Sequence, residues 1–156
     1  MNAHILGWLA KVRDQFIRKP GDVLEIGSLN INGTARSVFE IAATSYLGVD
    51  MCAGPGVDLM CNAHDLDLGR QFDTVLCLEM LEHDTHPHRT IDVLHKHAAR
   101  WLVISAAANG FREHKYPRDY WRFRPDAFRE LFFTGFVIRR LDVLRGPTII
   151  AIGERA

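Results

Sequence analysis

Short apolar runs alternate with segments of helical spacing along the whole chain. Residues 3–18 carry apolar side chains three or four positions apart, which predicts an amphipathic helix. Pro20-Gly21 then ends that helix. Five later runs are too short for helices and rich in branched apolar residues, so they predict strands. These runs occupy residues 23–26, 46–50, 57–60, 72–78 and 101–105.

The remaining segments complete an alternation of helices and strands. Apolar residues at helical spacing predict helices at residues 35–43, 88–99 and 125–133. Two further apolar runs, within residues 136–143 and at 148–152, flank Gly146-Pro147 and predict a hairpin. Alternating strands and helices indicate an α/β fold, doubly wound around a mostly parallel sheet of seven strands. The hairpin makes the last strand antiparallel.

The connection after the second predicted strand is unusually short. About six residues separate Asp50 from Val57, too few for a full crossover helix. Either a Gly-Pro loop replaces the helix, or the strand at 57–60 is not a parallel neighbour of the strand at 46–50. We favour the first alternative.

The first predicted strand leads into a turn that is typical of ligand-binding α/β folds. Gly27 ends the apolar run, Asn32-Gly33 is a turn signal, and Thr34 is suited to cap the next helix. In open α/β folds, nucleotide-like ligands bind at such a strand-to-helix turn. Glu25 lies within the strand, where a carboxylate is costly to bury unless something bonds to it. A ligand ammonium group would suit it.

Glu25-x-Gly27 after an apolar run resembles the first motif of the class I, Rossmann-like, S-adenosylmethionine (SAM) methyltransferases, and among them the small type-11-like group. Leu29 departs from the common pattern, which has a second glycine there. The resemblance spans nearly all of residues 20–152. It implies a Rossmann-like methyltransferase fold, shortened between strands two and three, with SAM as the cofactor. It also implies methyl transfer to a small-molecule or glycan-precursor acceptor.

Two other functions remain as alternatives. One is a SAM-binding domain without catalysis, vestigial or acting through a partner, and Leu29 in the cofactor loop is the feature that favours it. The other is an NAD-dependent Rossmann enzyme. The missing G-x-G-x-x-G motif and the predicted final hairpin argue against NAD.

Candidate cofactor-binding residues follow the predicted strands. Asp50 comes about 25 residues after Glu25, the relation in which an acidic residue bonds ribose hydroxyls. The resemblance implies that residues 61–66 recognise adenine, with Asn62 or Asp65 reading the base edge, and that Met51 lies against adenine unless it is a core residue. It places Glu79 at the methionine end. The expected set is Glu25, Gly27, Ser28, Asn30, Gly33, Asp50, Met51, Asn62, Ala63, His64 and Glu79.

A long polar and aromatic loop follows the fifth predicted strand, and such loops are usually functional. Its segment 119–125 resembles a phrase frequent in type-11-like proteins. His114 and Asp119 are the candidate catalytic bases, and a histidine titrates near neutral pH. The candidate acceptor-binding residues are Tyr116, Tyr120, Trp121 and Arg118. The aromatic residues could instead pin the loop to the domain, and the basic residues suit either an anionic acceptor or a solvated face.

Composition narrows the class of protein. The 156 residues predict a single domain, residues 1–156, in which residues 1–19 form an N-terminal cover helix. Nineteen acidic residues balance nineteen basic ones, which argues against a nucleic-acid partner. No apolar stretch is long enough to span a membrane, and the N-terminus lacks the pattern of a secretory signal. We therefore expect a cytoplasmic protein with a small-molecule substrate, and the sequence carries no signal for an oligomeric state.

Cysteines and histidines complete the candidate chemistry. The three cysteines are an odd number, and we expect reduced core residues. They are Cys52, Cys61 and Cys77. Five histidines crowd residues 83–97, near Glu82 and Asp84, but no pair has the i, i+4 spacing of a zinc-enzyme helix motif. We therefore expect no metal.

Overall fold

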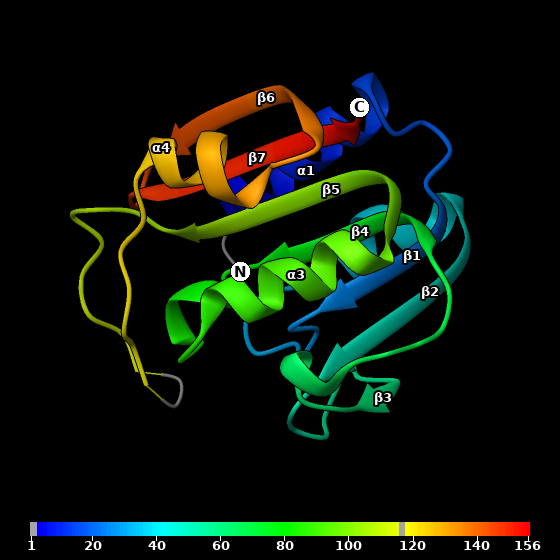
Figure 1. Ribbon diagram of the computed structural model, residues 1–156, viewed down its shortest axis with the longest axis horizontal. Coiled ribbons are helices and arrows are strands. Elements are labelled where there is room, and N and C mark those ends of the chain that lie inside the picture. The colour runs from blue at the N-terminus through cyan, green and yellow to red at the C-terminus, as the bar shows by residue number, and fades with distance from the viewer. Residues whose placement is uncertain (1–2, 116–117) are drawn as a thin grey trace.

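The computed structural model describes residues 3–115 and 118–156, and it forms one α/β unit around a seven-stranded sheet (Figure 1). The strands are β1 (Gly21–Ile26), β2 (Ala43–Asp50), β3 (Leu59–Met60), β4 (Phe72–Leu78), β5 (Ala98–Ala107), β6 (Phe136–Leu144) and β7 (Thr148–Arg155). The helices are α1 (Ala3–Gln15), α2 (Arg36–Phe39), α3 (Pro87–His97) and α4 (Pro125–Ala127). Short 3-10 turns occupy Glu40–Ala42, Ala63–Asp65 and Leu81–His83.

The strand order is β3-β2-β1-β4-β5-β7-β6. Neighbours from β3 to β5 are parallel, whereas β7 is antiparallel to both β5 and β6. The predicted fold class, with its antiparallel last strand, is therefore confirmed. β3 pairs in parallel with β2, although no helix connects them. The shortened connection is thus a loop, the alternative that the sequence favoured.

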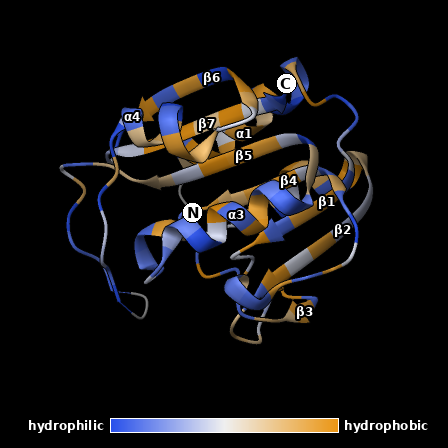
Figure 2. Cartoon of the chain, in the orientation of Figure 1, coloured by the Kyte–Doolittle hydropathy of each residue, from blue (hydrophilic) through white to orange (hydrophobic). Residues whose placement is uncertain are grey.

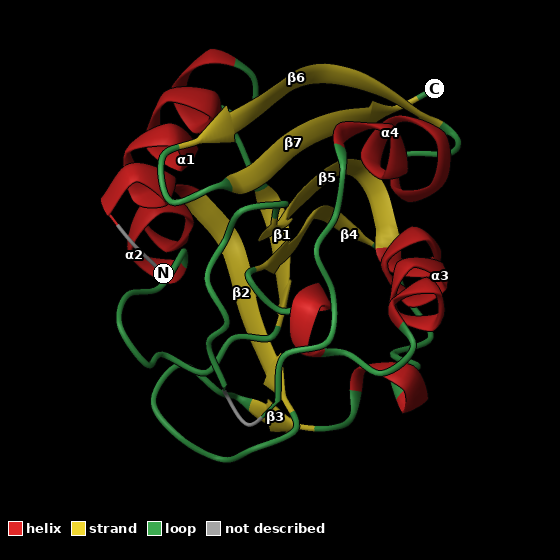
Figure 3. Ribbon diagram, turned by 90° about the vertical axis from the view of Figure 1, so that its left-hand side faces the viewer, coloured by secondary structure: helices red, strands yellow, loops and turns green. Residues whose placement is uncertain are grey.

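Helices cover both faces of the sheet, so the molecule has three layers (Figure 3). α1 and α2 pack on one face, where Leu9, Phe39 and Val103 are buried together. α3 and the segment after α4 pack on the other face, with Leu94 and Phe128 in the core. The central strands are mostly apolar in Figure 2, as expected for strands covered on both sides. α1 therefore covers the sheet, and none of its residues lines the functional cleft described below.

Three details of the predictions are wrong at the level of local structure. The helix expected at 35–43 ends in a 3-10 turn at Ala42, because Ala43 already pairs with Gly21 in the sheet. The helix expected at 125–133 has a single α turn, followed by a π turn at Phe128–Phe132 whose phenylalanines pack into the core. The third predicted strand is reduced to Leu59–Met60.

The cysteines and the lengths of the helices were both subjects of prediction. All three cysteines are free, as expected, but only Cys77 is buried in the core, while Cys52 is exposed. The longest described helix, α1, has 13 residues, and no described helix is long and apolar enough to cross a membrane.

Candidate functional site

A cleft of about 680 Å³ opens at the carboxyl ends of β1, β2 and β4. The chain leaves β1 in one direction towards β2 and returns on its other side as β4, so this is the topological switch point of the sheet. One end of the cleft is formed by the turn after β1 and by the loops after β2 and β3. The other end lies under the loop that follows β5; its described residues, 109–115 and 118–123, are here called the strap.

The turn after β1 needs a glycine. Gly27 has a φ of 84°, and a Cβ atom there would lie 2.9 Å from Cγ of Met80. The amide of Gly27 donates to the carbonyl of Val49 at 2.9 Å. Leu29, at the unusual position, donates its amide to Asp50, while its side chain lies against Gly54, where a Cβ atom would be 2.4 Å from Leu29 Cδ1. The loop thus accommodates Leu29.

Glu25 is almost completely buried, with 2% of its surface exposed. Its Oε2 accepts a hydrogen bond of 2.6 Å from the hydroxyl of Tyr46 on β2. Burial raises the pKa of the Glu25 carboxyl from 4.5 to about 7, and the Tyr46 hydrogen bond opposes that shift. The site therefore holds a carboxylate that a cation would stabilise.

Asp50 lies at the end of β2, next to the turn. Its Oδ2 accepts the amide of Leu29 at 3.1 Å, and its Oδ1 accepts the amide of Cys52 at 3.0 Å. Each carboxylate oxygen has a second lone pair for a ligand hydroxyl. Ser28, beside Asp50 in the cleft, has a buried Oγ without a hydrogen-bond partner among the described residues.

The loop after β3 forms one wall of the cleft. Asn62 caps the 3-10 turn, since its Oδ1 accepts the amide of His64 at 2.9 Å. Nε2 of His64 lies 2.8 Å from Oδ1 of Asp84, which orients the imidazole. Asp65, the competitor of Asn62, is exposed and outside the cleft lining. Met51 is 63% exposed and lines the cleft, so it is not a core residue.

Glu79 follows β4 in a conformation that is unusual for a residue with a side chain, with a φ of 53°. Its carboxylate accepts hydrogen bonds from Ser105 Oγ at 2.9 Å and from Thr148 Oγ1 at 3.4 Å. Burial raises the pKa of Glu79. The tertiary bonds to β5 and β7 hold this backbone at the floor of the cleft.

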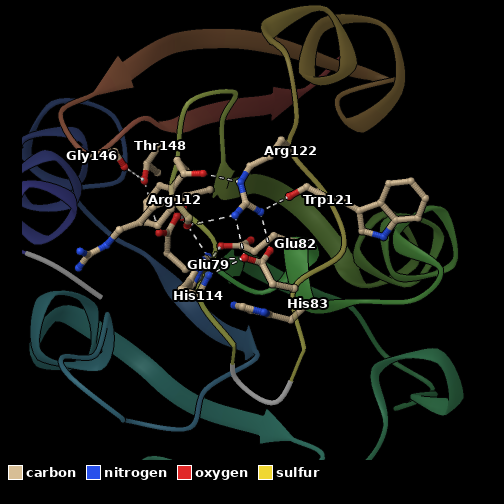
Figure 4. A network of polar contacts seen from close by, with 12 residues as sticks. Glu79, Glu82, His83, Arg112, His114, Trp121, Arg122, Gly146 and Thr148 are labelled. Carbon is tan, nitrogen blue, oxygen red and sulfur yellow. Dashed lines mark hydrogen bonds and ion pairs between the residues drawn. The ribbon is translucent and has the colours of Figure 1, made fainter.

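Arg122 holds the strap in shape (Figure 4). Its guanidinium binds both oxygens of Asp119 and also donates to the carbonyl of Phe111 at 3.0 Å. Trp121 donates its indole N–H to the carbonyl of Asp84 at 2.7 Å. Trp121 therefore pins the strap to the domain, and Arg122 is used within the protein rather than for an anionic acceptor.

His114 projects from the strap between two carboxylates. Its Nδ1 lies 3.3 Å from Oδ2 of Asp119, and its Nε2 lies 3.8 Å from Oε1 of Glu82. Asp119 also accepts the His114 amide at 2.7 Å. The hydrogen bonds from Arg122 hold the pKa of Asp119 well below its usual range, which makes Asp119 a poor proton acceptor. Its contacts suit a residue that positions His114.

The cleft brings together most of the residues singled out in the sequence. All cofactor candidates line it except Asn30, whose Oδ1 accepts the amide of Gly33. Of the acceptor-end candidates, His114, Arg118 and Tyr120 line the cleft, whereas Asp119 and Trp121 do not. Tyr116 lies outside the described residues.

Sequence reasoning missed two groups beside the strap. Glu82 and His83 were noted only as part of the histidine-rich stretch, yet the fold sets both beside His114. The available signal was their position just after β4, at the carboxyl edge of the sheet.

Comparison with known proteins places the chain in a family. The family model described as "Methyltransferase domain" matches residues 2–141. No curated protein matches the sequence significantly. A SAM-dependent methyltransferase from Clostridium acetobutylicum ATCC 824 superposes with a TM-score of 0.75 at 9% identity, over 99% of this chain and 93% of that one.

Two ligand-bound structures are also similar. Magnesium protoporphyrin IX methyltransferase from Synechocystis PCC 6803, with bound SAM, has a TM-score of 0.68 and 20% identity, over 97% of this chain and 76% of that one. N-methyltransferase NodS from Bradyrhizobium japonicum WM9, with S-adenosyl-L-homocysteine, has a TM-score of 0.67 and 12% identity, over 93% of this chain and 86% of that one. The resemblance noted in the sequence is thus confirmed: the chain belongs to the methyltransferase domain family and has the class I, Rossmann-like fold.

Proposed function

We propose that the protein binds SAM in this cleft and catalyses transfer of its methyl group to a small-molecule acceptor held under the strap. The observation that carries the proposal is the shared cleft itself. Two acidic strand ends, Glu25 and Asp50, meet the Gly27 bend at its one end, and the strap with His114 borders its other end. Cofactor and acceptor would therefore meet in one space.

The residues present fit the cofactor. SAM carries an ammonium group that Glu25 would bind, and this contact would offset the cost of burying that carboxylate. Asp50 would hold the two ribose hydroxyls with the free lone pairs of its carboxylate. Met51 and the backbone of Ala63 and His64 would hold adenine.

Bound SAM supplies a methyl group already activated by a positive sulfonium. The protein has to align the acceptor, exclude water and, for a protonated acceptor, accept a proton. The strap performs the first two tasks, since Trp121 and Arg122 fix it over the cleft. His114 is the group placed to accept a proton, and Asp119 would orient its ring.

The acceptor is proposed to be a small molecule with an anionic group, such as a glycan precursor. Arg118 is the only lysine or arginine that lines the cleft within the described residues, and Tyr120 lies next to it. Lys115 is paired with Glu113 at 3.2 Å, and Arg122 is paired with Asp119. The anionic hypothesis thus depends on Arg118. Among the structural neighbours, the enzyme from Synechocystis is named for a small-molecule substrate.

Calorimetric titration with SAM, S-adenosylhomocysteine and NAD tests the cofactor. We expect SAM and S-adenosylhomocysteine to bind with one site per chain and NAD not to bind. Asp50→Ala should weaken SAM at least about tenfold, because two charge-assisted hydrogen bonds are lost. Asp65→Ala is the matched control, since Asp65 is exposed and outside the cleft. Equal affinity of the two variants would contradict the placement of the ribose.

An acceptor screen that follows S-adenosylhomocysteine release tests turnover. Activity on a small anionic acceptor, with a KM that rises in Arg118→Gln, supports the whole proposal. Tight SAM binding without turnover on any acceptor would favour the alternative of a non-catalytic SAM-binding domain.

A further inference from the structure

Three side chains that can ligate a metal converge at the acceptor end of the cleft (Figure 4). Glu82 and His83 come from the 3-10 turn after β4, and His114 comes from the strap. One ligand atom from each lies within 4.8 Å of the other two. The rings of His83 and His114 are 4.7 Å apart between centroids. Small movements of these three side chains would bring their ligand atoms around one ion.

Glu82 is the least satisfied polar group of this cluster. Its side chain is fully buried, at 0% exposed, and neither carboxylate oxygen has a hydrogen-bond partner among the described residues. Such a carboxyl is costly unless a proton or a cation compensates it. The nearby guanidinium of Arg122 is committed to Asp119 and to backbone carbonyls. A ligand cation would supply what the protein does not.

Both histidines are oriented as metal-binding histidines are. Nδ1 of His83 lies 2.5 Å from the carbonyl oxygen of Arg118. A carbonyl only accepts, so Nδ1 carries the hydrogen and Nε2 keeps a free lone pair. Nδ1 of His114 faces the carboxylate of Asp119 at 3.3 Å, and its Nε2 faces Glu82. The carbonyl behind His83 is the kind of outer partner that fixes the tautomer of a metal ligand, whereas Nδ1 of His114 lies near Asp119 without a hydrogen bond among the described residues.

From these observations we infer that Glu82, His83 and His114 form a binding site for one divalent transition-metal ion. Two imidazoles and one carboxylate suit Zn²⁺ and its first-row neighbours rather than Mg²⁺ or Ca²⁺. Three protein ligands leave at least one coordination position open. His83 and His114 both line the cleft, so an ion bound by them would lie beside the proposed acceptor.

The inference deepens the proposed function and rests on it for the role of the ion. At this end of the cleft, the ion would bind an oxygen or nitrogen atom of the acceptor. It would lower the pKa of a bound hydroxyl, so that the hydroxyl loses its proton to solvent water in the cleft and not to the imidazole of His114. His114 would then act as a ligand, with Asp119 as its positioning residue.

Zinc titration of chelator-treated, full-length protein tests the site. We expect one Zn²⁺ per chain by calorimetry, and a visible absorption band when Co²⁺ takes its place. Glu82→Gln, His83→Ala and His114→Ala should each weaken Zn²⁺ by at least about 10-fold, since even outer partners of ligating histidines are worth about 10- to 100-fold. His88→Ala is the matched control, because His88 is exposed and outside the cleft.

Circular dichroism of each variant checks that it is folded, and Glu82→Gln, which removes a buried charge, keeps the test valid if a histidine variant unfolds. Zinc binding that is absent, or that is equal in Glu82→Gln and the wild type, would overturn the assignment. SAM titration of the metal-free protein separates the two proposals. If SAM binds and zinc does not, the metal site fails alone; if zinc binds and SAM does not, the proposed function fails.

Discussion

Single residues in this protein carry charges and backbone angles that folding alone does not favour. Glu25 is a carboxyl buried with one hydroxyl partner, and the buried carboxyl of Glu82 has no hydrogen-bond partner among the described residues. Gly27 occupies a left-handed conformation against Met80. Such features cost stability, so they concentrate at sites where ligand binding offsets that cost. All of these residues lie in or beside the cleft.

Glu25 should make the ligand-free protein less stable as the pH rises. Its pKa is about 7 when folded against an ordinary value of 4.5, so the folded state binds the proton more tightly. The resulting stabilisation is complete below a pH of about 4.5 and is lost as the pH rises through about 7, about 3 kcal/mol in all. Urea unfolding at pH 5 and pH 8 should show a loss that is smaller in Glu25→Gln than in the wild type by about this amount. Glu25→Gln keeps the loss that comes from Glu82, because burial also raises the pKa of that carboxyl from 4.5 to about 8.

The same variant should bind SAM about 10- to 100-fold more weakly at pH 8, where the wild-type carboxylate is charged. Calorimetry measures the affinity. A Glu25→Gln protein that is less stable than the wild type at pH 8, or that binds SAM equally well, would contradict the role given to this carboxylate.

Gly27→Ala should combine backbone strain with a collision. A side chain at a φ of 84° costs about 1–2 kcal/mol, and the new Cβ also meets Met80. Gly69→Ala is the matched control, since Gly69 has a φ of 61° with open space around it. Chemical denaturation should show a loss in both variants, larger in Gly27→Ala, whereas SAM affinity should fall only in Gly27→Ala.

At the scale of elements, the strap is held by side chains. It has little regular structure, and its shape depends on Arg122, Trp121 and Asp119 rather than on a helix or a ladder. Backbone amides of Tyr120 and Trp121 both donate to the carbonyl of Glu82, so the strap is tied to the turn after β4. Substitutions in either segment should therefore affect the acceptor end together.

Arg122→Gln should loosen the strap. It leaves the Asp119 carboxylate, 1% exposed, without its main partner, at a cost of about 1–3 kcal/mol or more. Hydrogen exchange of peptides within residues 111–123 should become faster, while exchange in β1 and β4 stays unchanged. Arg124→Gln is the control, because Arg124 is exposed and outside the cleft lining. Equal exchange in the two variants would show that Arg122 does not hold the strap.

In the whole molecule, the strand order places the site between β1 and β4. The strands that follow β1 in the chain lie on one side of it, and β4 and the later strands lie on its other side. The cleft is bordered by segments from five separate parts of the chain, so a ligand there bridges the halves of the sheet. Binding to the folded state alone raises its stability by mass action.

SAM at about 100 times its dissociation constant should add about 2.7 kcal/mol of stability. For a chain of this length that is a rise of about 5–10 °C in the melting temperature. Thermal denaturation with and without SAM measures it, with NAD as the ligand control and Asp50→Ala as the protein control. A shift with NAD equal to that with SAM would contradict the cofactor assignment.

The sequence by itself determined the strands, the β1 turn and the relation of Glu25 to Asp50, because periodicity and turn chemistry act over a few residues. It also determined the family. Only the tertiary structure decided that Arg122 pairs with Asp119 within the strap. It also decided that His114 lies beside Glu82 and His83, some 31 residues away along the chain. Such contacts form because the packing of helices and strands brings distant segments side by side. The spacing of residues along the chain does not predict them.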